Sequence, residues 1–273
     1  MAPKGSLNVV GIGIRFAAET TPEALECIKG ADRLFFLSAD SLAGHWLQKM
    51  NGSAESLQPF YAPGKDRSVT YEEMVEHVLK PVFAGFNVCL AAYGHPGAFA
   101  YPTHESVSRA RAAGFSARML PGISADACLI ADLGIDPAIA GMQSFEASDF
   151  LVYNRRHDPR SALILWQIGV IGEWRYKPQD TPWNPAGLKV LLETLLQDYD
   201  PRHEVIVYEA SPFVVCEPNV QRVPLAELAK AHITPISTLY VPPRETAEPD
   251  LDVLRRLGFD VPTLQQPARS ASE

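Results

Sequence analysis

The sequence predicts an α/β protein built as two successive halves of alternating strands and helices. Two stretches carry this prediction. The apolar run Asn87–Ala92 ends in a loop rich in glycine and proline (residues 94–97), and a second strand, Ser116–Leu120, ends at the Pro-Gly pair 121–122. Because α/β proteins bind ligands where such strands end, these two loops predict a small-molecule site.

The composition fits a globular protein with two domains or one large one. The chain has 273 residues, of which 47% are hydrophobic and 21% charged. Its net charge of −8 and the lack of a basic stripe argue against nucleic acid as the main partner. The N-terminus lacks the apolar core of a signal peptide, and no apolar run has the length of a membrane span. We therefore expect a cytoplasmic protein with no membrane partner.

The cysteines and histidines show no spacing typical of a metal site, and we expect no metal. Cys27, Cys89, Cys128 and Cys216 form no CxxC pair, and the first three lie in apolar stretches typical of small core residues. The glycines of residues 11–13 follow the first strand without the third glycine of a dinucleotide fingerprint. They predict a tight turn rather than a phosphate site.

The first half begins with a strand over residues 7–11. A helix over residues 22–30 follows, because Thr21 is a typical N-cap residue and Pro22 is favoured at the first helical position. Arg33–Leu37 is a short apolar run and predicts the next strand.

A helix over residues 71–84 is predicted by Thr70 and Glu73, which have the spacing of a capping box. This start places Tyr71 in the first helical turn and Arg67 in the loop just before it. A phenol at a helix N-terminus beside a guanidinium is an unusual environment for a tyrosine, because both groups favour its charged form.

The rest of the chain continues the alternation. Ser124 opens an apolar helix that ends at Gly134. The remaining predicted elements are a polar helix over 104–113, strands over 163–168, 204–208 and 236–241, a helix over 185–197, and a short segment, 220–224, that leads into 225–231.

These elements predict an N-terminal α/β domain over residues 1–120 and a C-terminal α/β domain over residues 121–244. Residues 245–273 form a polar tail with one short amphipathic piece, 251–257. The last seven residues are predicted to be disordered.

Several motifs occur together in one order: QPFYAPGKDRSVTY, YGHPGAFA, LPGISADACLIADLGIDP, QSFEASDFL and STLYVPP. With them the chain resembles the tetrapyrrole-methylase superfold, the class III S-adenosylmethionine (SAM) methyltransferases, over roughly residues 7–243. It is most similar to the borosin α-N-methyltransferases, which methylate backbone amides of a ribosomally made peptide, as in omphalotin biosynthesis. The resemblance implies that SAM binds in the cleft between the two domains and leaves as S-adenosylhomocysteine.

The resemblance also implies roles for individual residues. Tyr61, Arg67 and Tyr71 match the polar residues that activate the amide. The residues that match the cofactor pocket are Tyr93, His95, Ala98, Phe99, Ser124, Ala125, Gln167, Tyr208, Glu209, Ala210, Ser237 and Thr238.

The partners follow from the resemblance in the same way. Fused borosins continue into a helical clasp and an apolar core peptide, whereas this chain ends in LQQPARSASE. It is therefore expected to be of the split type, which methylates a separate precursor peptide in trans. The resemblance further implies a homodimer, with two precursors bound per dimer.

The chemistry needs a strong proton acceptor, because an amide nitrogen is a poor nucleophile whose lone pair is delocalised into the carbonyl. A phenol has an ordinary pKa near 10, which a guanidinium or a helix N-terminus lowers. We hypothesise that Tyr71 is the general base, while Tyr61 and Arg67 bind the carbonyl oxygen. The sequence leaves open which tyrosine loses the proton.

Alternatives remain open at this point. One is a precorrin-type methyltransferase of the same superfold, although an acidic chain fits a polyanionic tetrapyrrole poorly. Others are a non-catalytic protein that binds SAM or peptide, and a nucleic-acid methyltransferase. For single residues, His95 is expected only to line the pocket, Trp166 to lie in the core, and Glu146 and Asp149 to be helix-cap and loop residues.

Overall fold

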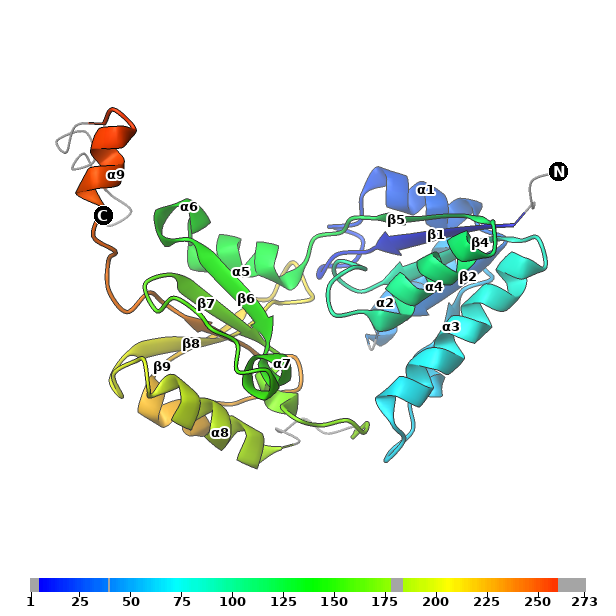
Figure 1. Ribbon diagram of the computed structural model, residues 1–273. Coiled ribbons are helices and arrows are strands. Elements are labelled where there is room, and N and C mark those ends of the chain that lie inside the picture. The colour runs from blue at the N-terminus through cyan, green and yellow to red at the C-terminus, as the bar shows by residue number, and fades with distance from the viewer. Residues whose placement is uncertain (1–4, 39, 178–183, 260–273) are drawn as a thin grey trace.

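The structure, a computed structural model, describes residues 5–38, 40–177 and 184–259, and in this part the chain forms two five-stranded sheets (Figure 1). The α/β class predicted from the sequence is confirmed. The first sheet is parallel, with strand order β3-β2-β4-β1-β5. Its strands are β1 (Ser6–Gly11), β2 (Arg33–Leu37), β3 (Glu55–Ser56), β4 (Asn87–Ala92) and β5 (Ser116–Leu120).

Helices cover both faces of the first sheet (Figure 1). On one face α3 (Arg67–Phe83) and α4 (Tyr101–Ala112) pack against alternate strand residues such as Val9 and Leu90. On the other face α1 (Pro22–Gly30) and α2 (Ser41–Met50) pack against the intervening residues, such as Val10. The strands are buried on both faces, which explains why they appear in the sequence as continuous apolar runs.

The second sheet is mixed, with strand order β6-β7-β10-β8-β9. β6 and β7 are parallel, and the other neighbouring pairs are antiparallel. The strands are β6 (Met142–Glu146), β7 (Ala162–Trp166), β8 (Glu204–Glu209), β9 (Asn219–Pro224) and β10 (Thr238–Val241).

The second sheet is also covered on both faces. One face packs against α7 (Ala147–Val152), α8 (Pro185–Leu195) and the 3-10 helix η3 (Leu225–Lys230). The other face packs against α5 (Ala125–Leu133). The remaining elements are α6 (Pro137–Ala140), the 3-10 helices η1 (Gln58–Phe60) and η2 (Ile168–Val170), and α9 (Leu251–Arg256), which stands apart from both sheets in Figure 1.

Several local predictions are confirmed. β2, β4 and β5 have the predicted bounds. The hydroxyl of Thr21 caps α1 by accepting a hydrogen bond from the amide of Ala24, at 3.2 Å. Ser124 is the N-cap residue of α5, and Gly134 ends that helix in the left-handed conformation, with φ of 64°.

The predicted start of α3 is wrong, and this changes the surroundings of Tyr71. The helix begins at Arg67, so Tyr71 lies in its second turn, beyond the reach of the dipole at its N-terminus. The Thr70 hydroxyl does not cap the helix but donates to the carbonyl of Asp66, at 3.1 Å. The Glu73 carboxylate does not cap it either and is hydrogen-bonded to Lys65.

Other differences are smaller. α4 begins at Tyr101 rather than at residue 104, and β7 ends at Trp166 because Gln167 has a positive φ of 60°. α2, β6 and α7 were not predicted from the sequence. The amphipathic piece of the tail is α9, whose Leu254 is buried. The last seven residues lie outside the described part of the chain.

The cysteines behave as the sequence predicts. Cys89 and Cys128 are buried in the two cores, Cys27 packs against the first core, and Cys216 is exposed. Over the described ranges, no group of three or more metal-binding side chains comes together. None of the helices described is long and apolar enough to cross a membrane.

Three loops meet at the carboxyl end of the first sheet, after β1, β4 and β5. A Cβ atom on Gly11 would lie 2.5 Å from the carbonyl oxygen of Gly94 and 2.7 Å from the Cα atom of Gly122. Gly94 also pairs with Gly13, its amide donating to the Gly13 carbonyl at 2.9 Å. The tight turn predicted for residues 11–13 is wrong: Gly11 ends β1, Gly13 pairs with Gly94 in an isolated bridge, and the chain turns at residues 16–18.

This packing predicts that Gly11→Ala lowers the free energy of unfolding by about 1–3 kcal/mol, because the new methyl group meets backbone atoms that cannot move aside. Gly30→Ala, at the end of α1, is the matched control, since nothing lies within 4 Å of its added Cβ. Urea unfolding of both variants measures the effect. Equal stability of the two variants would contradict the close approach of the loops.

Candidate functional site

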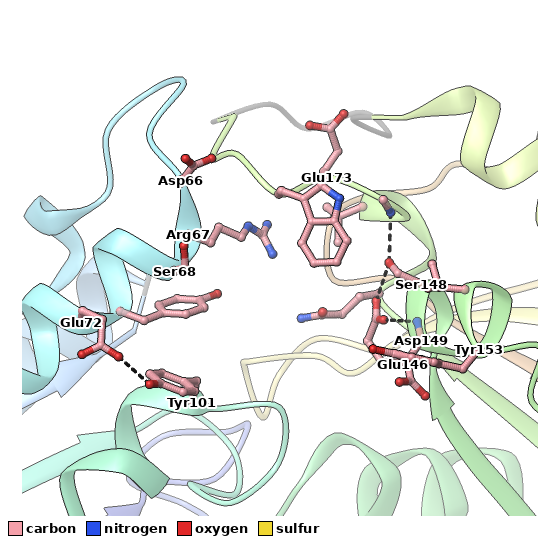
Figure 2. Close-up of a pocket in the computed structure, with 16 residues that line it drawn as sticks. Asp66, Arg67, Ser68, Glu72, Tyr101, Glu146, Ser148, Asp149, Tyr153 and Glu173 are labelled. Carbon is pink, nitrogen blue, oxygen red and sulfur yellow. Dashed lines mark hydrogen bonds between the residues drawn. The ribbon is translucent and has the colours of Figure 1, made fainter. Parts of the chain in front are cut away.

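A pocket of about 610 Å³ lies between the two halves of the chain (Figure 2). The start of α3 and the start of α4 form one wall, with Arg67, Tyr71 and Tyr101. The opposite wall comes from the end of β6, from α7 and from residues 167–174. The pocket has the volume of a small-molecule or peptide side-chain site.

An antiparallel backbone pairing joins the two walls. The amide of Gly64 donates to the carbonyl of Tyr176 at 3.0 Å, and the amide of Tyr176 donates to the carbonyl of Lys65 at 3.1 Å. The amide of Arg67 donates to the carbonyl of Trp174, also at 3.0 Å. The loop 64–67 of the first half is thus paired with the segment 174–176 of the second half.

Side chains reinforce this pairing. The Arg175 guanidinium lies 3.5 Å from the carboxylate of Asp66, the residue that faces it across the pairing. Both side chains are more than half exposed, so this ion pair adds little stability. α3 begins at Arg67, directly where the pairing ends, which explains why its start precedes the predicted one.

The structure brings Tyr61, Arg67 and Tyr71 together: Arg67 and Tyr71 line the pocket, and Tyr61 packs against Tyr71. The ring of Tyr61 meets the ring of Tyr71 edge to face, with centroids 6.4 Å apart and an interplanar angle of 89°. Figure 2 shows the Arg67 side chain pointing from the start of α3 toward the opposite wall. Tyr61 follows η1 in a loop, so the three side chains come from two separate pieces of chain.

The surroundings of Tyr61 favour its protonated form. Burial raises the pKa of Tyr61 well above its ordinary value of 10, and the neighbouring Tyr71 raises it further. The Arg67 guanidinium opposes this shift by favouring the charged form of Tyr61.

Tyr101, at the start of α4, packs against the wall that α3 forms. Tyr101 stacks on Tyr71, with centroids 6.2 Å apart and an interplanar angle of 26°. Its hydroxyl donates to Glu72, as Figure 2 shows, and Arg109 donates to the other Glu72 oxygen at 2.7 Å. These two partners hold the pKa of Glu72 below its usual range, with the Tyr101 bond as the larger cause.

The opposite wall is built around the start of α7. Glu146 caps this helix by accepting a hydrogen bond from the amide of Asp149 at 2.7 Å, as its position in the sequence predicts. The Ser148 hydroxyl donates to Glu146 and accepts from the amide of Gly172, both at 3.0 Å. Asp149 pairs with Arg155 through two hydrogen bonds. This wall is therefore anionic and internally hydrogen-bonded.

The residues predicted for the first cofactor loop follow β4. The His95 ring accepts a hydrogen bond from the amide of Gly97 through Nδ1, at 2.9 Å, and the amide of Ala98 donates to the His95 carbonyl. This bond fixes the ring as part of the loop. Phe99 has a positive φ of 51°, an uncommon conformation for a bulky residue, and its side chain is 55% exposed.

The second predicted loop starts α5. Ser124 is the N-cap residue of this helix and Ala125 is its first residue. The Ser124 hydroxyl donates to the carboxylate of Asp126 rather than to the helix backbone. The backbone amides at the start of α5 are therefore not capped by Ser124.

The residues predicted from the second half meet where β7 and β8 end and β10 begins. The amide of Ile168, next to Gln167, donates to the Ser237 carbonyl at 3.1 Å. The Ser237 hydroxyl in turn donates to the carboxylate of Glu209, which also accepts from Thr234 at 2.7 Å.

The other residues of this group differ in how far they are buried. Tyr208 is fully buried, and its hydroxyl donates to Asp132 at 2.7 Å. Thr238 is 3% exposed, and Ala210 is partly buried against the second core. The side chain of Tyr208 therefore points into the core rather than toward a ligand.

Two contacts place the predicted loops of both halves close together. The rings of Phe99 and Trp166 lie 5.9 Å apart. The Tyr93 side chain is 42% exposed, yet burial of its phenol, with the charges of Cys128, Glu19 and Glu209, raises its pKa to about 12. Among the predicted cofactor residues, Gln167 is the one that lines the pocket of Arg67 and Tyr71. Gln167 thus connects the predicted cofactor residues with the residues that line the pocket.

Sequence reasoning missed several pocket residues. Tyr101, Tyr153 and Trp174 are aromatic residues of the wall, and Glu173 lies beside Trp174. The motif QSFEASDFL contributes to the family resemblance, but its Glu146 and Asp149 are predicted to be helix-cap and loop residues rather than pocket residues. The two aromatic residues 174 and 176 in GEWRYKP are the sequence feature that could have identified this wall. No local pattern indicates that they lie next to α3.

The chain belongs to the tetrapyrrole (corrin/porphyrin) methylases, because that family matches residues 6–229. Two solved structures show the same fold. The chain superimposes on uroporphyrin-III-C-methyltransferase from Thermus thermophilus with a TM-score of 0.60 and 15% identity, over 93% of this chain and 96% of the other. A cobalt precorrin-4 methyltransferase gives a TM-score of 0.63 and 14% identity, over 89% and 96%.

Within this family the chain is similar to fungal methyltransferase/precursor fusion proteins. It is 37% identical to the gymnopeptide precursor of Gymnopus fusipes, over 93% of this chain and 61% of that protein. It is 39% identical to a type I borosin precursor of Coprinopsis marcescibilis (88% and 62%). It is 35% identical to the omphalotin A precursor of Omphalotus olearius (98% and 64%). The chain thus spans about three fifths of the length of these relatives.

The raised pKa of Tyr93 predicts a dependence of stability on alkaline pH. The folded state favours the neutral phenol, so this stabilisation is complete below pH 10 and is lost as the pH rises through about 12. We expect the free energy of unfolding of the wild type to fall more steeply over this range than that of Tyr93→Phe. Urea unfolding at stepwise pH measures both slopes, and identical slopes would contradict the burial of this phenol.

Proposed function

We propose that this chain is a SAM-dependent α-N-methyltransferase that methylates backbone amides of a ribosomally made peptide. The observation that carries the proposal is the edge-to-face pair Tyr61–Tyr71 beside Arg67, with Arg67 and Tyr71 lining a pocket between the two halves of the chain. The similarity to methyltransferase/precursor fusions supports a peptide substrate.

The proposed cofactor residues fit SAM in their chemistry. Phe99 and Tyr93 offer exposed aromatic surface for a purine, and the loops after β4 and β5 offer backbone polar groups. The strained backbone of Phe99 and Gln167 is typical of positions held for binding. SAM would supply a methyl group on a sulfonium, which an amide nitrogen accepts once its proton is removed.

In the proposed mechanism Tyr71 takes the amide proton. The hydrogen bond donated by Tyr61 stabilises negative charge on the Tyr71 oxygen, so the charge comes to lie between a phenol donor and the nearby guanidinium of Arg67. The Tyr61 phenol stays protonated because its pKa is raised. Arg67 points into the pocket, where it can bind the amide carbonyl oxygen as negative charge develops on it.

The lining of the pocket favours a peptide over a tetrapyrrole. Among the described lining residues Arg67 is the cation. Five carboxylate side chains line the pocket, namely those of Asp66, Glu72, Glu146, Asp149 and Glu173. Four of these acids are paired with basic side chains behind the lining, so the described walls give a polyanionic tetrapyrrole one cationic partner, Arg67, rather than a basic cleft. The exposed rings of Tyr153 and Trp174 give apolar surface for a peptide side chain instead.

The connection between enzyme and peptide is a separate question. The relatives are fusions of methyltransferase and precursor. The trans-acting substrate, the homodimer and the complex with two precursors stay predictions.

The test is intact-mass spectrometry of a precursor peptide co-expressed with this chain, with tandem fragmentation to place any added mass. Methyl increments on backbone nitrogens of the separate peptide support the full proposal. Increments on the chain itself support methylation in cis and contradict the trans-acting type. An unmodified peptide and chain, with SAM bound, would contradict peptide methylation.

Within this assay we expect Tyr71→Phe to lower the methylation rate by at least about a hundredfold while SAM still binds, because the proton acceptor is lost. Tyr199→Phe is the matched control, since the Tyr199 hydroxyl is buried in the second core without a hydrogen-bond partner. Wild-type turnover of Tyr71→Phe would overturn its assignment as the base.

A further inference from the structure

Tyr176 belongs to the second half of the chain, yet its closest contacts are with the first half. Its backbone forms two hydrogen bonds, with Gly64 and Lys65, at 3.0 and 3.1 Å. Its ring lies 4.9 Å from the ring of Tyr61, at an interplanar angle of 34°. Tyr176 is therefore held by its backbone at the place where its ring covers Tyr61.

We propose that Tyr176 is a positioning residue that orients Tyr61 in the candidate catalytic group. The group is then complete only while segment 174–176 of the second half is paired with loop 64–67 of the first. This inference rests on the proposed methyl transfer, in which Tyr61 donates a hydrogen bond to Tyr71.

The position of Tyr61 in the chain explains why it needs such support. It follows η1 in a loop, and residues 62–64 after it are exposed. Its amide is bound to the carbonyl of Gln58 at 3.0 Å, which fixes the backbone but leaves the side-chain rotamers free. The rings of Tyr71 and Tyr176 contact the Tyr61 ring from two directions, one edge-on and one tilted. The pair of rings defines the direction of the phenol.

Tyr176 also affects the protonation of Tyr61. Burial is the largest cause of the raised pKa of Tyr61, and the nearby Tyr176 phenol also raises this pKa. The facing groups are Tyr71 and Tyr176, which raise this pKa, and Arg67, which lowers it. The Tyr176 phenol thus adds, after burial and Tyr71, to the preference of Tyr61 for its protonated form.

The experiment compares Tyr176→Ala and Tyr176→Phe in the full chain, with SAM and the peptide that the wild type methylates. We expect Tyr176→Ala to lower kcat about tenfold, with the Kd for SAM unchanged, because Tyr61 is no longer held in line. Tyr176→Phe keeps the ring and is expected to stay within about twofold of the wild type. Equal kcat for wild type and Tyr176→Ala would overturn the proposal.

Tyr176→Phe separates positioning from a general loss of structure, because it keeps the ring that holds Tyr61. A kcat as low in Tyr176→Phe as in Tyr176→Ala would mean that Tyr176 does not act by positioning the ring of Tyr61.

Phe83→Ala is the control for losing a partly exposed aromatic pair. Phe83 lies at the other end of α3, about 24 Å from Arg67 along the helix, and contacts Phe115 at 5.3 Å. Its kcat should equal that of the wild type. If Tyr176→Ala melts early, Tyr176→Leu, which keeps apolar bulk, replaces it.

The two proposals fail in different ways. Wild-type turnover of Tyr71→Phe would overturn the proposed catalytic group itself. Loss of turnover in Tyr71→Phe together with wild-type kcat in Tyr176→Ala would overturn the role of Tyr176 alone.

Discussion

The pairing of loop 64–67 with segment 174–176 is the constraint on which the candidate site depends. It places Arg67 at the start of α3, Trp174 in the wall of the pocket and Tyr176 on the ring of Tyr61. Each half has its own sheet and its own main core, and Ile14 of the first half is buried in a cluster of the second. The site needs both halves, because its walls come from both.

The chemistry of the site follows from burial rather than from the helix dipole. Tyr71 lies too far into α3 for the helix N-terminus to stabilise its charge. The partner that remains is Tyr61, whose raised pKa keeps its phenol protonated, with Arg67 beside it. In the proposed mechanism this neutral phenol supports the negative charge that Tyr71 takes up, so two chemically equal side chains are assigned different roles.

The sequence was sufficient for much of the fold and for part of the site. β4 and β5 could be predicted because strands buried on both faces are continuous apolar runs. Tyr61, Arg67 and Tyr71 were predicted from the family resemblance, because no local sequence pattern identifies them as a group. Tyr176 could not be found in either way, because its contacts join residues far apart in the chain. For the same reason the start of α3 was misplaced: a tertiary pairing, not the local capping box, determines it.

Hydrogen exchange of single amides tests the central claim most directly. The amides of Gly64, Arg67 and Tyr176 each donate a backbone hydrogen bond that joins the halves. If the halves are paired in solution, these amides exchange at least about a hundredfold more slowly than in an unstructured peptide. Exchange at the unstructured rate, with the two cores still protected, would show that the halves are not paired and that the candidate site is not assembled in the free protein.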